Sequence, residues 1–315
     1  MDFMRLLNQH YNTMLKALKG LGYKSFTPVS GVTEFIRYIG TKYPNSDSIT
    51  KEMFDDWLSQ RVFNTSSNKS YVMTKVRGFL RYLRGVGVDA FVPGRDYSIR
   101  IERFIPYIFT DEELTRLFEI FDTLPPEPRT PKRHNIVPVL FRMMYCCGMR
   151  PSEPPSLLVD DVNLETGEIY IRKSKYKDRR ILMSQDMLDI CRAYAKSMTP
   201  VEYFFERFPQ CKISAYWIER QLKFCWERSG LPKRGKPRPY DFRHNFVART
   251  MTRWVEEGKD INSFAPFLSA YLGHESFKET LYYFHLVPER LLKNSGIDWS
   301  RFSSIYPEVH YEQDL

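Results

Sequence analysis

Apolar residues recur at three- and four-residue spacing through most of this chain, and that pattern restricts its fold more than any other feature. It predicts helices at 3–18, 32–39, 53–62 and 71–83, with glycine and proline between them. Two short runs, 167–172 and 179–183, are predicted instead to be strands joined by a tight basic turn. From 185 to 290 the spacing is helical again. The sequence therefore predicts a mainly α fold with one small antiparallel β-hairpin.

A linker is predicted at 92–106, because this segment has prolines near both ends and no helical period. Thr110 and Glu113, which follow it, have the spacing of a capping box, so a helix is expected to begin there. A chain of 315 residues is long enough for two domains. We expect an N-terminal helical domain at 1–104 and a second, mostly helical domain at 105–315.

The composition favours a polyanionic partner. The net charge is +9 and the pI about 9.2, and nucleic acid is the commonest partner for such a chain, although a merely basic protein would carry the same excess. No apolar run approaches the ~18–20 residues that span a bilayer, so no membrane contact is expected. The five cysteines are odd in number and form no CxxC pair, which makes a disulfide framework or a zinc site improbable and favours the reducing cytoplasm.

Polar residues suited to attack on a phosphodiester are spread over the C-terminal half. They are Arg150 in CCGMRPSE, the basic hairpin RKSKYKDRR, Arg243 and His244 in RPYDFRHNF, His274 in YLGHES, and Tyr283 in ETLYYFH. The planar fork of arginine binds phosphate and keeps its charge, and a tyrosine hydroxyl can act as a nucleophile. Taken singly, each has an ordinary structural explanation, such as a histidine satisfied within an apolar core.

The order and spacing of these motifs resemble the tyrosine recombinases, also called the phage-integrase family. The family's turn Gly-hydrophobic-Arg-x-Ser-Glu is matched at 148–153, and its Leu-Gly-His triplet at 272–274. A tyrosine follows nine residues later, at Tyr283. The second box, His-x-x-Arg-His, is matched at 240–244 except that Tyr240 replaces the first histidine. The resemblance has strong motifs over roughly 105–290, and it implies the two-domain architecture of that family.

Site residues follow from the resemblance, position by position. The family takes a catalytic lysine from the hairpin, where Lys175 fits best and Lys173 nearly as well. Spacing selects Tyr283 rather than Tyr282 as the nucleophile. Glu153 is expected to orient a neighbouring cation. If the first histidine of the second box assists proton removal, the tyrosine there is a poorer base, and the neighbouring histidine or water could take the proton. The candidate catalytic residues are Arg150, Lys175, Tyr240, Arg243, His244, His274 and Tyr283.

Basic residues of the hairpin and of the loop before the second box are predicted to grip the DNA backbone, an affinity term that is independent of sequence and sensitive to salt. The resemblance adds that the N-terminal domain clamps the duplex from the side opposite the catalytic domain. The predicted DNA contacts are Arg172, Lys173, Lys177, Arg179, Arg180, Lys233, Arg234, Lys236 and Arg238.

The predicted function is site-specific strand exchange on double-stranded DNA, serving integration, excision or transposition of a mobile element. Tyr283 would form a 3′-phosphotyrosyl link and release a 5′ hydroxyl. Since one ester replaces another, neither a cofactor nor a metal is required. A homotetramer on two duplexes is the assembly that the resemblance implies, with or without an accessory recombinase or directionality factor, which the sequence does not reveal. Three alternatives stay open: a catalytically silent DNA-binding relative, a topoisomerase-like enzyme that nicks and reseals, and a basic helical interaction protein.

Overall fold

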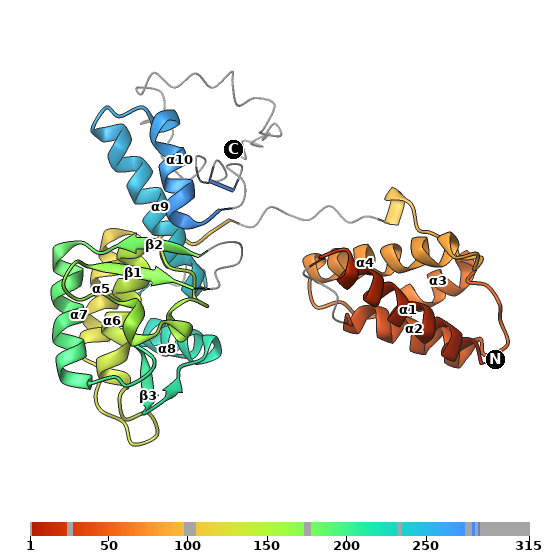
Figure 1. The fold of residues 1–315 in the computed structure, drawn as a ribbon, viewed down its shortest axis with the longest axis horizontal. Coiled ribbons are helices and arrows are strands. Elements are labelled where there is room, and N and C mark those ends of the chain that lie inside the picture. Colours follow the sequence, from red (N-terminus) through yellow and green to blue (C-terminus); the bar gives the residue numbers. More distant parts are fainter. Residues whose placement is uncertain are drawn as a thin grey trace. The chain divides into compact units, whose positions relative to one another are not determined.

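The computed structural model describes residues 2–23, 28–97, 105–172, 178–231, 235–274, 279–280 and 283. The chain divides into two compact units, Met1–Phe104 and Ile105–Leu315. Both units are built mainly from helices (Figure 1), so the predicted fold class is confirmed. In the described segments, no helix is both long and apolar enough to cross a membrane.

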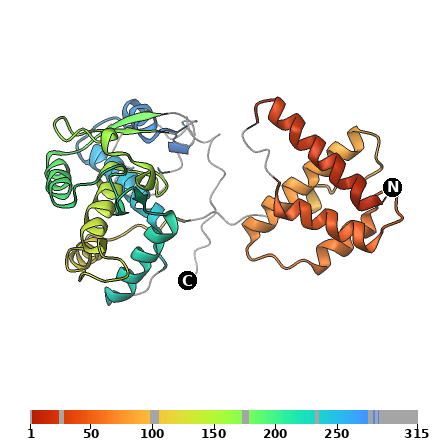
Figure 2. The same ribbon diagram turned by 60° about the horizontal axis from the view of Figure 1, so that its bottom comes forward.

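In its described residues, unit 1 is a bundle of four α-helices followed by one 3-10 turn at Arg95–Tyr97, and Figure 2 shows it from a second direction. The helices are α1 (Phe3–Gly20), α2 (Ser30–Lys42), α3 (Lys51–Gln60) and α4 (Ser66–Gly85). The side chains of Asp2, Thr50 and Thr65 cap α1, α3 and α4 by accepting backbone N–H groups of the first turn. Helix α3 ends at Gln60, before the predicted position, and Val62 beyond it is 89% exposed.

Aromatic side chains fill the core of unit 1. Phe35 and Trp57 meet edge to face with ring centroids 4.9 Å apart, and Tyr11 meets Phe79 at 5.2 Å. These residues come from all four helices, and each is at most 3% exposed. Their burial explains why helical spacing in the sequence located these helices well.

Unit 2 is arranged around α6 (Arg133–Cys147), which packs against α5 (Asp111–Asp122), α7 (Gln185–Met198) and α9 (Pro239–Glu256). The predicted capping box between Thr110 and Glu113 opens α5. Two further helices, α8 (Ala215–Arg228) and α10 (Ile261–Leu272), pack against α9. Helix α6 is buried along most of its length, and its first and last residues, Arg133 and Cys147, are both buried within the unit.

The predicted hairpin is present as β1 (Glu168–Ile171) and β2 (Arg179–Leu182), paired antiparallel. Ile171 is opposite Arg179, and Ile169 is opposite Ile181. Side chains alternate between the two faces of a strand, so Arg179 shares the buried face with these isoleucines while Arg180 points outward. The register therefore turns one arginine of this basic segment into the protein.

A second hairpin lies where the sequence predicted only helix. It consists of β3 (Glu206–Phe208) and β4 (Cys211–Lys212), joined by a turn in which Gln210 has a φ of 59°. Such short strands produce no detectable alternation, which explains why the prediction for 185–290 was wrong at this point. The hairpin follows Phe204 and Phe205, whose burial anchors this segment against Tyr194 of α7.

Candidate active site

The turn after α6 brings Arg150 into the interior of unit 2. Gly148 ends the helix in the left-handed region, with φ of 61°, and a Cβ there would lie 2.5 Å from the ring of Phe246. Arg150 is only 7% exposed. Its Nη2 donates to the carbonyl of Gly273, 2.8 Å away. The glycine that the sequence placed before this arginine is thus required both by backbone conformation and by packing.

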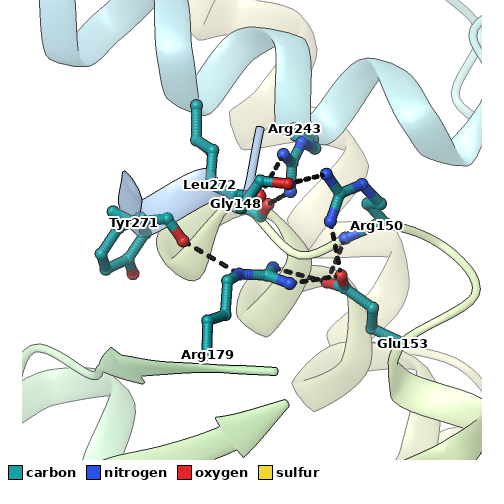
Figure 3. Close-up of polar contacts among 8 residues, drawn as sticks. Gly148, Arg150, Glu153, Arg179, Arg243, Tyr271 and Leu272 are labelled. Carbon is teal, nitrogen blue, oxygen red and sulfur yellow. Dashed lines mark hydrogen bonds and ion pairs between the residues drawn. The ribbon is translucent and has the colours of Figure 1, made fainter. Parts of the chain in front are cut away.

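Glu153 joins two arginines. Its carboxylate accepts hydrogen bonds from the backbone N–H and Nη1 of Arg150, at 2.7 and 3.0 Å. It also accepts a two-pronged contact from Nη1 and Nη2 of Arg179, at 2.6 and 2.8 Å (Figure 3). Burial by itself would raise the pKa of Glu153, but the hydrogen bonds and charge of Arg179, with the charge of Arg243, lower it overall. Glu153 is therefore held as an anion that orients cations, as the sequence predicted.

Arg243, on α9, has no exposed surface. Its Nη1 donates to the carbonyl of Gly148 at 2.8 Å and its Nη2 to that of Leu272 at 2.7 Å, while its buried Nε has no partner among the described residues. Burial, and next the charge of Arg150, lower the pKa of Arg243 to about 10, so the side chain stays cationic at neutral pH. An anion bound beside the two guanidinium groups would offset their mutual repulsion.

His274 follows the turn that ends α10. Gly273 forms that turn with a φ of 64°. The imidazole Nδ1 of His274 lies 2.7 Å from the hydroxyl oxygen of Thr280, a side chain with no exposed surface. The ring is nearly parallel to that of Tyr283, with an interplanar angle of 3° and centroids 6.2 Å apart. Thr280 therefore fixes the rotation of the histidine ring beside the tyrosine.

The hydroxyl of Tyr283 lies 3.0 Å from Nδ1 of His244, and both side chains are buried. The ring of Tyr240 lies against the ring of His244, with the two ring centroids 4.9 Å apart. Tyr240 and Tyr283 both interact electrostatically with Arg243. The phenol of Tyr283 thus lies next to the imidazole of His244 and interacts with the buried cation of Arg243.

The structure brings most of the predicted catalytic residues together: Arg150, Tyr240, Arg243, His244, His274 and Tyr283. Lys175 and its rival Lys173 lie outside the described residues, as do Tyr282, Lys177, Lys233 and Arg234. Four predicted DNA contacts are exposed, namely Arg172, Arg180, Lys236 and Arg238. Three of these form ion pairs, Arg172 with Asp161, Arg180 with Glu168 and Arg238 with Asp241.

Arg179 is the exception, and the prediction of a surface contact with DNA is corrected for it. Arg179 is only 9% exposed, and its guanidinium is engaged by Glu153 and by the carbonyl of Tyr271, at 2.9 Å from Nε. The sequence contained an indication of this burial: Arg179 is two residues from Ile181, so both side chains lie on the same face of the strand. Thr280 was also missed, since a single threonine in a helical pattern carries no distinguishing signal.

The site thus combines a buried phenol, an imidazole bonded to it and two guanidinium groups fixed beside them. Such groups can attack a phosphodiester and hold the charge that develops on its oxygens. Chemically, this arrangement is suited to transesterification of a phosphodiester by a tyrosine.

The comparisons with known proteins agree with this class. The sequence model of the Phage integrase family matches residues 108–290, more than half of the chain. The tyrosine recombinase XerA of Thermococcus kodakarensis is 30% identical over 235 residues, which make up 73% of this chain and 75% of that protein.

Among solved structures, the Tn1549 transposon integrase in complex with transposon right end DNA has a TM-score of 0.63 at 14% identity, covering 96% of this chain and 100% of that one. Lambda integrase bound to DNA has a TM-score of 0.61 at 15% identity, covering 87% and 92%. These likenesses show the shared fold. The chain belongs to the phage integrase family of tyrosine recombinases. It is a tyrosine-type site-specific recombinase, an enzyme that breaks and rejoins DNA strands.

Proposed function

We propose that Tyr283 is the nucleophile of this recombinase and that His244 is its general base. The observation that carries the proposal is the 3.0 Å contact between the tyrosine hydroxyl and Nδ1 of His244, beside the buried cation of Arg243. For this role Nδ1 accepts the hydrogen bond, which requires the ring proton to be on Nε2. Imidazole is the side chain most often used to take a proton in catalysis.

In the proposed reaction, His244 takes the phenolic proton while the phenolate oxygen forms a bond to phosphorus. The bond from phosphorus to the 5′ oxygen breaks, and that oxygen receives a proton from a lysine of the hairpin, for which Lys175 is the candidate. Arg150, Arg243 and His274 hold the charge on the non-bridging oxygens. The 5′ hydroxyl of a partner strand then reverses these steps, so the number of ester bonds is conserved.

The partners belong to the same proposal. The substrate is double-stranded DNA with specific recombination sites, and the N-terminal unit (residues 1–104) binds the duplex together with the exposed basic residues of unit 2. Four protomers act on two duplexes, with or without an accessory recombinase or directionality factor, to integrate, excise or transpose a mobile element. The five cysteines are free thiols, in keeping with a cytoplasmic site of action on DNA.

The test is covalent capture. Duplexes that bind the protein are selected from a randomised library, and each is then nicked at successive positions so that cleavage releases a short fragment and cannot be reversed. We expect a protein–DNA adduct that maps to Tyr283 by peptide mass. Failure to trap an adduct on a duplex that the protein binds would favour the silent relative. An adduct that reseals but never joins two duplexes would favour the topoisomerase-like enzyme.

A further inference from the structure

Arg179 makes contacts that differ from those of the other arginines in its segment. Its two terminal nitrogens contact both oxygens of Glu153, and its Nε donates to the carbonyl of Tyr271. Every nitrogen of the guanidinium therefore makes a contact within the protein. Figure 3 shows this side chain reaching from β2 toward Glu153, which Arg150 also contacts. Because the side chain is also only 6% exposed, it is held inside the protein and is not presented to DNA.

These contacts link three parts of the site that are far apart in the sequence. Through Glu153, Arg179 is connected to the backbone and side chain of Arg150. Through Tyr271, it is connected to the turn that ends at Gly273, to which Arg150 is also bonded. The packing at this turn is tight, since a Cβ on Gly273 would lie 2.9 Å from Cδ of Arg179. Arg179 thus fixes the turn that precedes His274 as well as the anion that holds Arg150.

The contact with Glu153 needs an arginine on physical grounds. A planar guanidinium offers two parallel N–H groups to a carboxylate, whereas a lysine ammonium offers a point charge. The side chains of Arg179 and Glu153 are only 6% and 4% exposed, so water cannot replace the missing bond. Removing Arg179 would leave the buried Glu153 carboxylate with Arg150 as its remaining ion-pair partner.

Resting on the proposed function, we propose that Arg179 is a positioning residue for strand cleavage: it holds Glu153 and the Tyr271–Gly273 turn so that Arg150 and His274 meet the phosphate. Arg179 itself touches no DNA. Because Arg179 begins β2, it also joins the arginines of the site to that strand.

The experiment compares Arg179→Met and Arg179→Lys with the same two changes at Arg142. Arg142 is a matched control, since it also makes a two-pronged contact, with Asp122 at 2.6 Å for each bond, between α5 and α6 and away from the site. The DNA is the nicked duplex used for covalent capture. Two quantities are measured: the dissociation constant as a function of salt, and the single-turnover cleavage rate at saturating DNA.

We expect both Arg179 variants to bind DNA as the wild type does, with the same salt dependence, and to cleave about 100-fold more slowly, as a displacement near 1 Å of a reacting group would cause. The Arg142 variants should cleave at the wild-type rate. The inference is overturned if Arg179→Met cleaves normally at saturating DNA, or if it binds less tightly with a salt slope reduced by about 1, the signature of a lost phosphate contact.

A pH profile separates positioning from loss of structure. Without Arg179, the buried Glu153 keeps the charges of Arg150 and Arg243 but loses its strongest stabilising partner, so it should take up a proton at higher pH. As the pH is lowered, the cleavage rate of Arg179→Met should therefore begin to fall at a higher pH than the cleavage rate of the wild type. Glu153→Gln/Arg179→Met should lack that shift. An identical acid limb in wild type and Arg179→Met would contradict the inference.

If Arg179→Met does not fold, Arg179→Lys, Glu153→Gln and Glu153→Gln/Arg179→Lys form a cycle that keeps the positive charge. We expect the double variant to cleave no more slowly than the slower single variant, because both changes break one contact. Losses that multiply would overturn the inference. Capture by the wild type stands as the separate test of the proposed function: if the wild type traps no adduct on a duplex that it binds, the proposed function is wrong. If the wild type cleaves and the Arg179 variants match its rate, this inference is wrong.

Discussion

The hydroxyl of Tyr283 and Nδ1 of His244 lie 3.0 Å apart, within hydrogen-bonding distance. His244 is the residue directly after Arg243 on α9, so one helix presents both a cation and an imidazole to the phenol. Since the first position of the second box holds Tyr240, this contact offers an alternative route for the proton.

Replacing His244 tests that route. We expect His244→Gln to slow single-turnover cleavage by about 10²–10⁴-fold, the usual contribution of a general base, because glutamine keeps polarity without accepting a proton. DNA binding should be unaffected. If His244→Gln cleaves at the wild-type rate, the group that takes the phenolic proton is not His244.

The nucleophile is tested separately. Tyr283→Phe should abolish covalent capture, whereas Tyr282→Phe should retain it. The reverse pair of results would show that Tyr282 is the nucleophile.

The two arginines should be separately required. Arg150→Ala and Arg243→Ala are each expected to slow cleavage by about 10²–10³-fold, because each removes a fixed charged donor from the transition state. The larger loss of stability is expected for Arg243→Ala, whose side chain also bridges the carbonyls of Gly148 and Leu272. Thermal unfolding recorded alongside the cleavage rate separates the two effects. Normal cleavage in either variant would exclude that arginine from the chemistry.

The sequence predicted the fold class for a physical reason, whereas the candidate site residues came from the resemblance of its motifs to a known family. Helical spacing is set by burial, so it located α1, α2 and α4 closely, and Gly148 and Gly273 marked the two turns because each requires a positive φ. Alternation in β2 also indicated which face is buried, but the basic character of its segment outweighed that signal, and Arg179 was placed on the surface. The short β3–β4 hairpin gave no period long enough to detect. Side-chain partners such as Thr280 for His274 depend on three-dimensional contact between turns, which no local pattern contains.

Thr280 provides a test of how His274 is oriented. Thr280→Val removes the hydroxyl that lies 2.7 Å from Nδ1 of His274 while keeping the shape of a buried side chain. An unmet buried hydrogen bond costs about 1–3 kcal/mol, and we expect a slower cleavage rate with unchanged DNA affinity. Thr280→Ser is the matched control, because it restores the hydroxyl and should recover most of the rate. Equal rates in the valine and serine variants would show that this contact does not orient the ring.

Glu153 predicts how stability changes with pH. Its pKa in the folded protein is lower than the ordinary value of 4.5, so the unfolded chain takes up the proton first as the pH falls. The stabilisation is therefore complete above pH 4.5 and is lost as the pH drops through the lowered value. The difference in unfolding free energy between wild type and Glu153→Gln should be largest near neutral pH and shrink in acid. A difference that stays constant from neutral pH to acid would show that Glu153 titrates equally in both states.

Tyr240 is the remaining departure from the family's second box, and restoring histidine there tests its role. Tyr240 is half-buried with its ring against His244, so an imidazole at this position would add a second group able to accept the phenolic proton. We expect Tyr240→His to cleave as fast as the wild type or faster. Tyr240→Phe keeps the ring contact and removes the hydroxyl, so a slower rate in this variant alone would assign the hydroxyl a hydrogen bond to the phosphate. Complete loss of cleavage in Tyr240→His would show that the tyrosine has a required role of its own that histidine cannot fill.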